Sequence, residues 1–226
     1  MASLANLFLS PHPDDLVYSA FAAITAHSGD VNAVILFNVS RFTKWGLLPK
    51  NLVTMMRTLE ETMILSRLGL RPSFLWMDDY SIRTKPIDRN ELALKLAQLG
   101  NPTGTLYCPL GIGKHPDHLA ARDAAIAYWL SCKCKPRICF YEDLPYAARI
   151  DRVDLEFERC VRSLPQSLPK LSVHYEPLSA ELLRKKAFFS GLYLTQTDHR
   201  RLLERRGMEL GRRCSSLCAE RCVCSQ

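Results

Sequence analysis

The chain has 226 residues, 47% of them hydrophobic, with a formal net charge of +7 and a pI near 9.0. This length and apolar content predict a single domain, with a core over 4–150 and a C-terminal extension of it over 151–226. Lys and Arg are spread out before the last thirty residues and no aromatic ladder accompanies them, which disfavours nucleic acid as a partner. No apolar run reaches the roughly 18 residues of a membrane span, and the N-terminus lacks a signal-peptide pattern, so we expect a soluble cytoplasmic protein.

Short apolar runs alternate with amphipathic segments up to residue 141. The runs predict strands over 4–9, 31–39, 74–77, 105–109 and 137–141, with helices over 16–27, 52–68, 90–99 and 116–130. The run 31–39 is almost continuously apolar, which is typical of a parallel strand covered on both faces. The alternation predicts an α/β fold with a Rossmann-like, mostly parallel sheet flanked by helices in three layers.

The pattern weakens after Pro145. It predicts a helix over 155–164, a strand over 171–175 and a helix over 179–193. The arginine-rich stretch 199–213 predicts a last helix, and its charge is typical of a face in contact with solvent.

Nine cysteines are many for such a chain. Cys108, Cys139 and Cys160 lie in apolar stretches and are interpreted as buried thiols. The tail holds Cys214, Cys218, Cys222 and Cys224, whose spacing does not match the paired C-x-x-C pattern of a structural zinc site. We expect free thiols on a frayed helix there, with a second metal site as the less favoured alternative.

The turn Pro11-His12-Pro13-Asp14-Asp15 follows the first predicted strand and precedes a helix. Two prolines restrict the backbone of this turn and so hold the imidazole and the two carboxylates in one arrangement. Two of these three side chains suffice to bind a divalent ion, and the third can then act on water bound to the ion.

A second turn, His115-Pro116-Asp117-His118, repeats this chemistry after the fourth predicted strand. Because the carboxyl ends of parallel strands share one edge of a sheet, the two turns can converge. His12, Asp15 and His118 then form a ligand set for catalytic zinc, although another divalent transition metal could take its place.

The remaining polar side chains of the two turns suit the hydrolysis of an acyl group. Asp14 can take a proton from zinc-bound water, whose pKa is about 7. His115, if Asp117 keeps it protonated, can donate to the oxyanion that forms at the carbonyl. Isolated histidines such as His27, His174 and His199 are more often structural, and we assign them no role.

These two turns resemble the PIG-L/LmbE family of zinc-dependent N-deacetylases, which includes N-acetylglucosaminyl deacetylases. Further segments match the family: Arg57-Thr58-Leu59-Glu60 followed by Leu68-Gly69, Asp79, and Tyr141-Glu142-Asp143-Leu144-Pro145-Tyr146.

The resemblance implies a Rossmann-like fold and removal of an acyl group, usually acetyl, from an amino sugar or glycoconjugate. It implies zinc ligands at His12, Asp15 and His118, a base at Asp14 and carbonyl polarisation by His115. The matched segments imply substrate contacts from Arg57, Asp79, Glu142 and Asp143.

The chain departs from the family in two places. Leu16-Val17-Tyr18-Ser19-Ala20 replaces the usual glutamate and small residues, which implies a more apolar pocket floor, and the cysteine-rich tail has no counterpart. Three alternatives to an N-deacetylase stay open: an amidase acting on a larger sugar or thiol conjugate, an inactive binding protein that retains the metal, and a dinucleotide-binding oxidoreductase. The last is disfavoured because the first turn lacks a G-x-G-x-x-G motif.

Overall fold

A seven-stranded sheet forms the centre of the computed structural model, which describes residues 5–27, 31–196, 199–214 and 218–225. The strands are β1 (Asn6–Ser10), β2 (Val31–Ile35), β3 (Leu70–Phe74), β4 (Thr105–Pro109), β5 (Arg137–Tyr141), β6 (Leu171–Leu178) and β7 (Cys218–Ser225). Their order across the sheet is β3-β2-β1-β4-β5-β7-β6. The first five strands pair in parallel, and β7 runs antiparallel to both of its neighbours.

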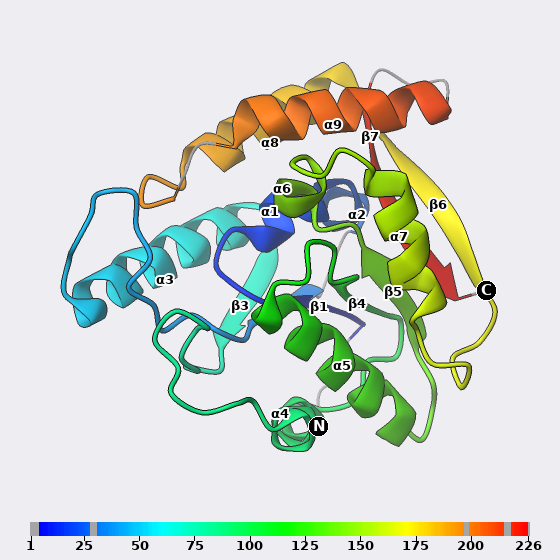
Figure 1. Ribbon diagram of the computed structural model, residues 1–226, viewed down its shortest axis with the longest axis horizontal. Coiled ribbons are helices and arrows are strands. Elements are labelled where there is room, and N and C mark those ends of the chain that lie inside the picture. Colours follow the sequence, from blue (N-terminus) through cyan, green and yellow to red (C-terminus); the bar gives the residue numbers. More distant parts are fainter. Residues whose placement is uncertain (1–4, 28–30, 197–198, 215–217, 226) are drawn as a thin grey trace.

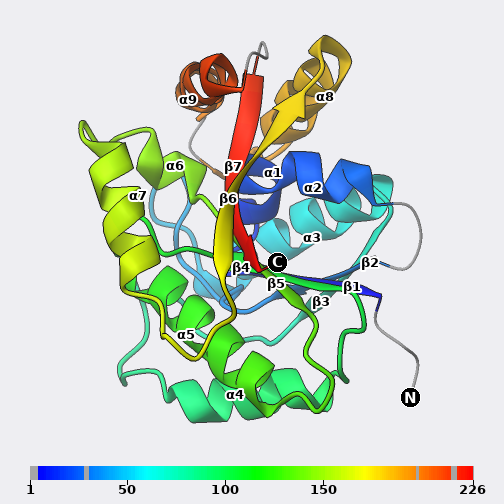
Figure 2. The same cartoon turned by 90° about the vertical axis from the view of Figure 1, so that its right-hand side faces the viewer.

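Helices cover both faces of the sheet (Figure 1, Figure 2). They are α1 (Asp15–Ser19), α2 (Phe21–Ala26), α3 (Lys50–Arg67), α4 (Arg89–Gln98), α5 (Pro116–Ser131), α6 (Leu144–Ala147), α7 (Val153–Arg162), α8 (Ala180–Gly191) and α9 (Arg200–Arg213). Leu7 and Leu9 pack toward α4 and α5, whereas Phe8 between them packs toward α2 and α3. This alternation along β1 follows from the two-residue period of a strand. The prediction of a three-layer α/β fold is confirmed.

Several predicted elements differ in their bounds from the structure. The strand expected over 31–39 ends at Ile35, and the strand expected over 171–175 continues to Leu178. The helix expected over 16–27 breaks at Ala20, whose φ of −129° separates α1 from α2. The third strand lies over 70–74 instead of 74–77, because Gly69 ends the preceding turn with a φ of +84° and pairing begins at the next residue. Pro72 falls within this strand, and the position is tolerated because β3 is the edge of the sheet.

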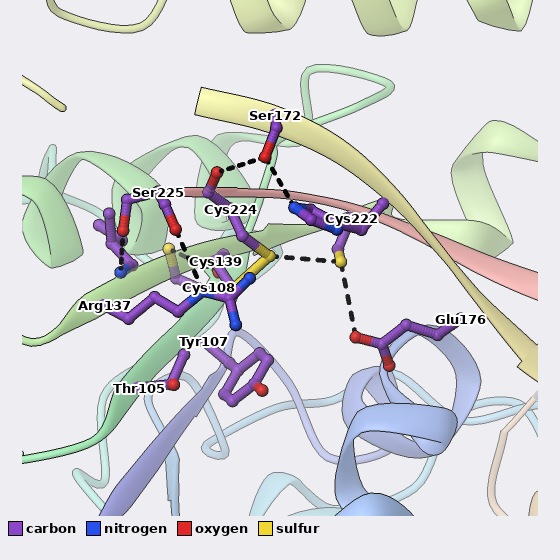
Figure 3. Close-up of a disulfide and its surroundings, with 12 residues drawn as sticks. Thr105, Tyr107, Cys108, Arg137, Cys139, Ser172, Glu176, Cys222, Cys224 and Ser225 are labelled. Atoms are coloured by element: carbon purple, nitrogen blue, oxygen red, sulfur yellow. Dashed lines mark hydrogen bonds between the residues drawn. A yellow bond between two sulfur atoms is a disulfide. The ribbon is translucent and has the colours of Figure 1, made fainter. Parts of the chain in front are cut away.

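The prediction of free thiols on a frayed helix in the tail was wrong for the helix and for Cys224, whereas Cys214 and Cys222 are free thiols. Residues 218–225 form β7 between β5 and β6, and Cys224 stands directly opposite Cys139 in the register. The two form a disulfide, so Cys139 is not the free thiol that the sequence indicated (Figure 3). Among the side chains that the structure describes, the clusters able to hold a metal ion lie at the two predicted turns and not in this tail.

Buried ion pairs fix the C-terminal extension to the rest of the sheet. Arg206 of α9 and Arg221 of β7 both donate hydrogen bonds to the carboxylate of Glu142, and all three side chains are buried. Lys186 of α8 pairs with Glu220 of β7, and Glu220 also accepts the backbone N–H of Ala22. None of the described helices is long and apolar enough to cross a membrane.

Candidate active site

The candidate site lies at the carboxyl ends of the parallel strands, where the turns after β1 and β4 meet. The rings of His12 and His118 have centroids 5.3 Å apart, and the ring of His115 lies 5.1 Å from that of His12. In the first turn, Ser10 Oγ donates to the carbonyl of His12 at 2.6 Å, and the N–H of His12 donates to Asp15 Oδ2 at 2.9 Å. Both bonds join residues within the turn, so local contacts fix the positions of His12 and Asp15.

Three side chains of these turns direct atoms at one point. His12 Nδ1 and His118 Nε2 each lie 3.3 Å from Asp15 Oδ2. A tetrahedral zinc ion with bonds of about 2.0 Å would set its ligand atoms about 3.3 Å apart. His118 Nε2 is also fully buried and makes no hydrogen bond. An unsatisfied nitrogen with this donor set around it fits a transition-metal ion.

A second set of carboxylates orients the two histidines. Asp117 Oδ2 accepts the Nε2–H of His12 at 2.8 Å, and Asp143 Oδ1 accepts the Nδ1–H of His118 at 2.5 Å. The other oxygen of Asp143 accepts the backbone N–H groups of Gly111 and Ile112 at 2.8 and 2.9 Å. Each histidine therefore turns its other nitrogen toward Asp15, which is the arrangement that metal-binding histidines need.

The charges of the site reinforce one another. Burial alone would raise the pKa of Asp15, but the neighbouring imidazole of His118 outweighs it and lowers that pKa. Burial would likewise lower the pKa of His118, and the carboxylates of Asp15 and Asp143 instead raise it to about 10. Burial and the charge of Asp15 both raise the pKa of Asp14 well above its usual range. The adjacent carboxylates of Asp14 and Asp15 thus have their pKa values shifted in opposite directions.

The backbone at Asp14 has a φ of +102°, a conformation that residues other than glycine rarely adopt. Two side chains of α3 hold it. Arg57 donates from Nη2 to the carbonyl of Pro13 at 3.2 Å, and Glu61 Oε2 accepts the N–H of Asp14 at 3.1 Å. That carbonyl and that N–H belong to the same peptide unit, so side chains one helical turn apart fix its orientation from both ends.

The contacts of Asp117 differ from the hypothesis that it keeps His115 protonated. Its carboxylate bonds His12, the N–H of Tyr80 and the guanidinium of Arg83, whereas only its backbone N–H reaches His115, donating to Nδ1 at 3.3 Å. Burial and the nearby imidazoles lower the pKa of His115 to about 4. His115 is therefore neutral at pH 7, with its proton on Nε2.

A cavity of about 350 Å³ opens over these groups. It is lined by His12, Asp14, Asp15, Tyr18, Phe42, Arg57, Asp79, Tyr80, Ser81, His115, Asp117, Pro145, Tyr146, Arg149, Gln196 and His199. A second cavity of about 490 Å³ shares Phe42 and Ser81 with it. Volumes of this size suit small ligands, and the wall combines aromatic rings with polar groups of both charges.

The side chains predicted to contact a substrate separate into two pairs. Arg57 and Asp79 line the cavity. Glu142 and Asp143 do not, because both are fully buried behind it. Glu142 is bound by two arginines, and Asp143 is bound by His118 and the Gly111 loop.

Several residues of the site carried no recognised sequence signal. Glu61 accepts hydrogen bonds from Asp14 and from the hydroxyl of Tyr193, and burial raises its pKa to about 7. Gln196 and His199 reach the cavity from the segment between α8 and α9. Glu61 follows directly on the Arg57–Glu60 motif, whereas Tyr193 and Gln196 come from a part of the chain where the pattern was weak.

The chain is thus an α/β protein with a buried cluster of His12, Asp15 and His118 at the carboxyl edge of its sheet. The carboxylate of Asp14 lies beside this cluster in the cavity, and such a set of groups is typical of hydrolases. The chain belongs to the PIG-L family, because the model described as GlcNAc-PI de-N-acetylase matches residues 7–129. It is 30% identical over 217 residues to the 2'-N-acetylparomamine deacetylase of Streptomyces fradiae, covering 85% of this chain and 74% of the relative.

Solved structures share the fold. The zinc-inhibited form of the teicoplanin deacetylase Orf2 superimposes with a TM-score of 0.77 at 19% identity, over 97% of both chains. The A40926 pseudoaglycone deacetylase Dbv21 gives a TM-score of 0.73 at 21% identity, over 98% of this chain and 97% of the other. The C-terminal extension is therefore part of an architecture that these enzymes also have.

Proposed function

We propose that this protein is a zinc-dependent N-deacetylase, which hydrolyses an N-acyl group, most readily acetyl, on an amino sugar or glycosylated metabolite. The observation that carries the proposal is the common 3.3 Å spacing of His12 Nδ1 and His118 Nε2 from Asp15 Oδ2, with Asp14 beside them at the floor of the cavity. Membership of the PIG-L family and the activity named for the Streptomyces fradiae relative support the same reaction.

His12, Asp15 and His118 would hold the ion. When bound, the ion would act as a Lewis acid and lower the pKa of a neighbouring water. Asp14 would take the proton of the attacking water on its carboxylate and pass it to the departing amine. Its place in the cavity next to Asp15 suits this role, and the peptide held by Arg57 and Glu61 fixes its direction.

His115 would donate a hydrogen bond to the acyl oxygen. Its Nδ1 accepts the N–H of Asp117, so Nε2 carries the proton that can be donated. A neutral imidazole suffices to stabilise the developing oxyanion, provided that its donor is aimed at that oxygen beforehand. Asp117 would act through His12, which it orients, and not through His115.

Arg57 and Asp79 would contact hydroxyl groups of the substrate, since both line the cavity. For Asp143 we propose a role in orienting His118, and for Glu142 a role in anchoring the C-terminal extension. The adjoining cavity of about 490 Å³ leaves room for a second group on the substrate. It favours, as a second candidate, an amidase reaction on a larger sugar conjugate through the same residues.

The test is release of free amine from a panel of N-acetylated sugars and glycosides, measured with and without chelator. We expect a chelator to abolish release and zinc to restore it. Asp14→Ala should lower turnover about a hundredfold or more with its metal retained, and His118→Ala should lower the bound zinc itself. A panel cleaved equally well by the chelated protein would refute metal dependence. Zinc binding without any amine release would favour an inactive binding protein.

A further inference from the structure

Helix α3 combines buried charged side chains with exposed apolar ones, although Val53, Ile64 and Leu65 are also buried. The structure describes all of its residues, and the three charged side chains of its interior turns, Arg57, Glu60 and Glu61, are buried. Leu52, Met55, Leu59 and Met63 are exposed instead. A helix on a solvated surface normally shows the reverse distribution.

The exposed residues of α3 form a stripe. They are separated by three, four and four positions, which places them on one side of the helix. The loop that leads into the helix adds Trp45 and Leu47, which are also exposed, and Figure 1 shows this loop at the outer edge of the molecule, next to the N-terminal end of α3. We call these six residues, Trp45, Leu47, Leu52, Met55, Leu59 and Met63, the α3 face.

The charged side chains that border the α3 face are mostly basic. Between residues 41 and 71 the only acidic residues are Glu60 and Glu61, which lie inside the protein. The charged side chains of this segment that reach solvent are therefore all basic: Arg41, Lys44, Lys50, Arg67 and Arg71. Asp78 offsets Lys50 in part, at 4.0 Å.

We propose that the α3 face docks on the surface of a membrane that contains anionic lipids, with the helix lying in the plane of the surface. An apolar stripe with tryptophan, bordered by lysine and arginine, is the composition of segments that bind the interface in this way. A second copy of the chain is the less favoured occupant, because pairing two such faces would bring basic borders together without exposed acidic residues from this segment to match them.

Docking would also place the candidate active site close to the membrane. Phe42, three residues before Trp45, lines both the catalytic cavity and the adjoining one. A substrate anchored in or concentrated at the membrane would then have the shorter path to the site. The docking itself does not depend on the proposed deacetylase reaction.

The test uses the whole protein and sedimentation with vesicles of phosphatidylcholine, alone or with about a third phosphatidylglycerol. We expect binding to the anionic vesicles, reduced about tenfold by Leu59→Glu and by Lys44→Glu. The matched control is Leu94→Glu. Leu94 is 66% exposed on α4, against 54% for Leu59, and lies on the other side of the sheet, so its substitution should leave binding unchanged.

Any of three results would overturn the proposal. The first is no binding of the parent protein to anionic vesicles. The second is equal binding of the Leu59→Glu and Leu94→Glu proteins. The third is a lipid-free dimer in sedimentation velocity that Leu59→Glu dissociates, which would make the α3 face an interface between copies. Circular dichroism of both variants checks that the fold is retained.

Discussion

Glu61 offers the sharpest test of how Asp14, the proposed base, is positioned. Its Oε2 accepts the N–H of Asp14 at 3.1 Å and the hydroxyl of Tyr193 at 2.5 Å, and the side chain is fully buried. Glu61→Leu removes this acceptor and leaves two buried donors unpaired, at about 1–3 kcal/mol each. The peptide between Pro13 and Asp14 would then be held by Arg57 alone, although the φ of +102° at Asp14 is unfavourable by itself.

We expect kcat to fall about a hundredfold in Glu61→Leu, since a displacement of about 1 Å in a catalytic group has an effect of that size. KM and zinc content should stay near those of the parent, because Glu61 does not line the cavity or belong to the ligand set. Glu61→Gln keeps one carbonyl oxygen as an acceptor and should recover most of the lost kcat. The assay is steady-state amine release, with zinc measured on the same samples.

The control for this experiment is the preceding residue. Glu60 is also a buried carboxylate of α3, but it accepts from the N–H of Thr195 at 2.9 Å and from the Thr195 hydroxyl, not from the first turn. Gln196, which lines the cavity, is the next residue and donates to the Thr195 hydroxyl. Glu60→Leu should therefore displace Gln196 and raise KM, and it should leave kcat largely unchanged. If both leucine variants lowered kcat equally, or if Glu61→Leu kept full turnover, the positioning argument would be wrong.

Two further predictions concern groups behind the site. Asp143→Asn should weaken zinc binding about 10- to 100-fold in a competition titration, because it alters the partner of His118 Nδ1; an unchanged affinity would contradict the orienting role. Cys224→Ser removes a disulfide that joins residues 85 apart and should lower the free energy of unfolding by about 2–4 kcal/mol. Cys134→Ser, at an exposed free thiol, should leave the denaturation midpoint unchanged, and equal midpoints for the two variants would contradict the stabilising role of the disulfide.

The parallel half of the fold could be predicted because its signals are local. The fourth and fifth strands have the predicted bounds, 105–109 and 137–141, since each is a short apolar run with breaks at both ends. The two histidine-bearing turns follow from the same logic, because parallel strands end at one edge. The convergence of these two turns could be predicted without knowing which side chains from other parts of the chain pack against them.

The C-terminal strand could not be predicted in this way. In β7 the consecutive residues Glu220 and Arg221 are both buried, which removes the alternation that marks a strand. Their burial is possible because Lys186 and Glu142, far away in the sequence, neutralise them. Glu142 was predicted to contact the substrate for the same reason. Its place in a family segment does not indicate that two arginines of the C-terminal extension, Arg206 and Arg221, bond its carboxylate.

The place of β7 links the surroundings of the candidate site to strand pairing that is distant along the chain. β7 lies between β5 and β6 and is the strand that joins β6 to the rest of the sheet. It also carries Arg221, which bonds Glu142, the neighbour of the aspartate that bonds His118. A substitution that weakens the pairing of β7 is therefore expected to disturb the surroundings of His118 as well.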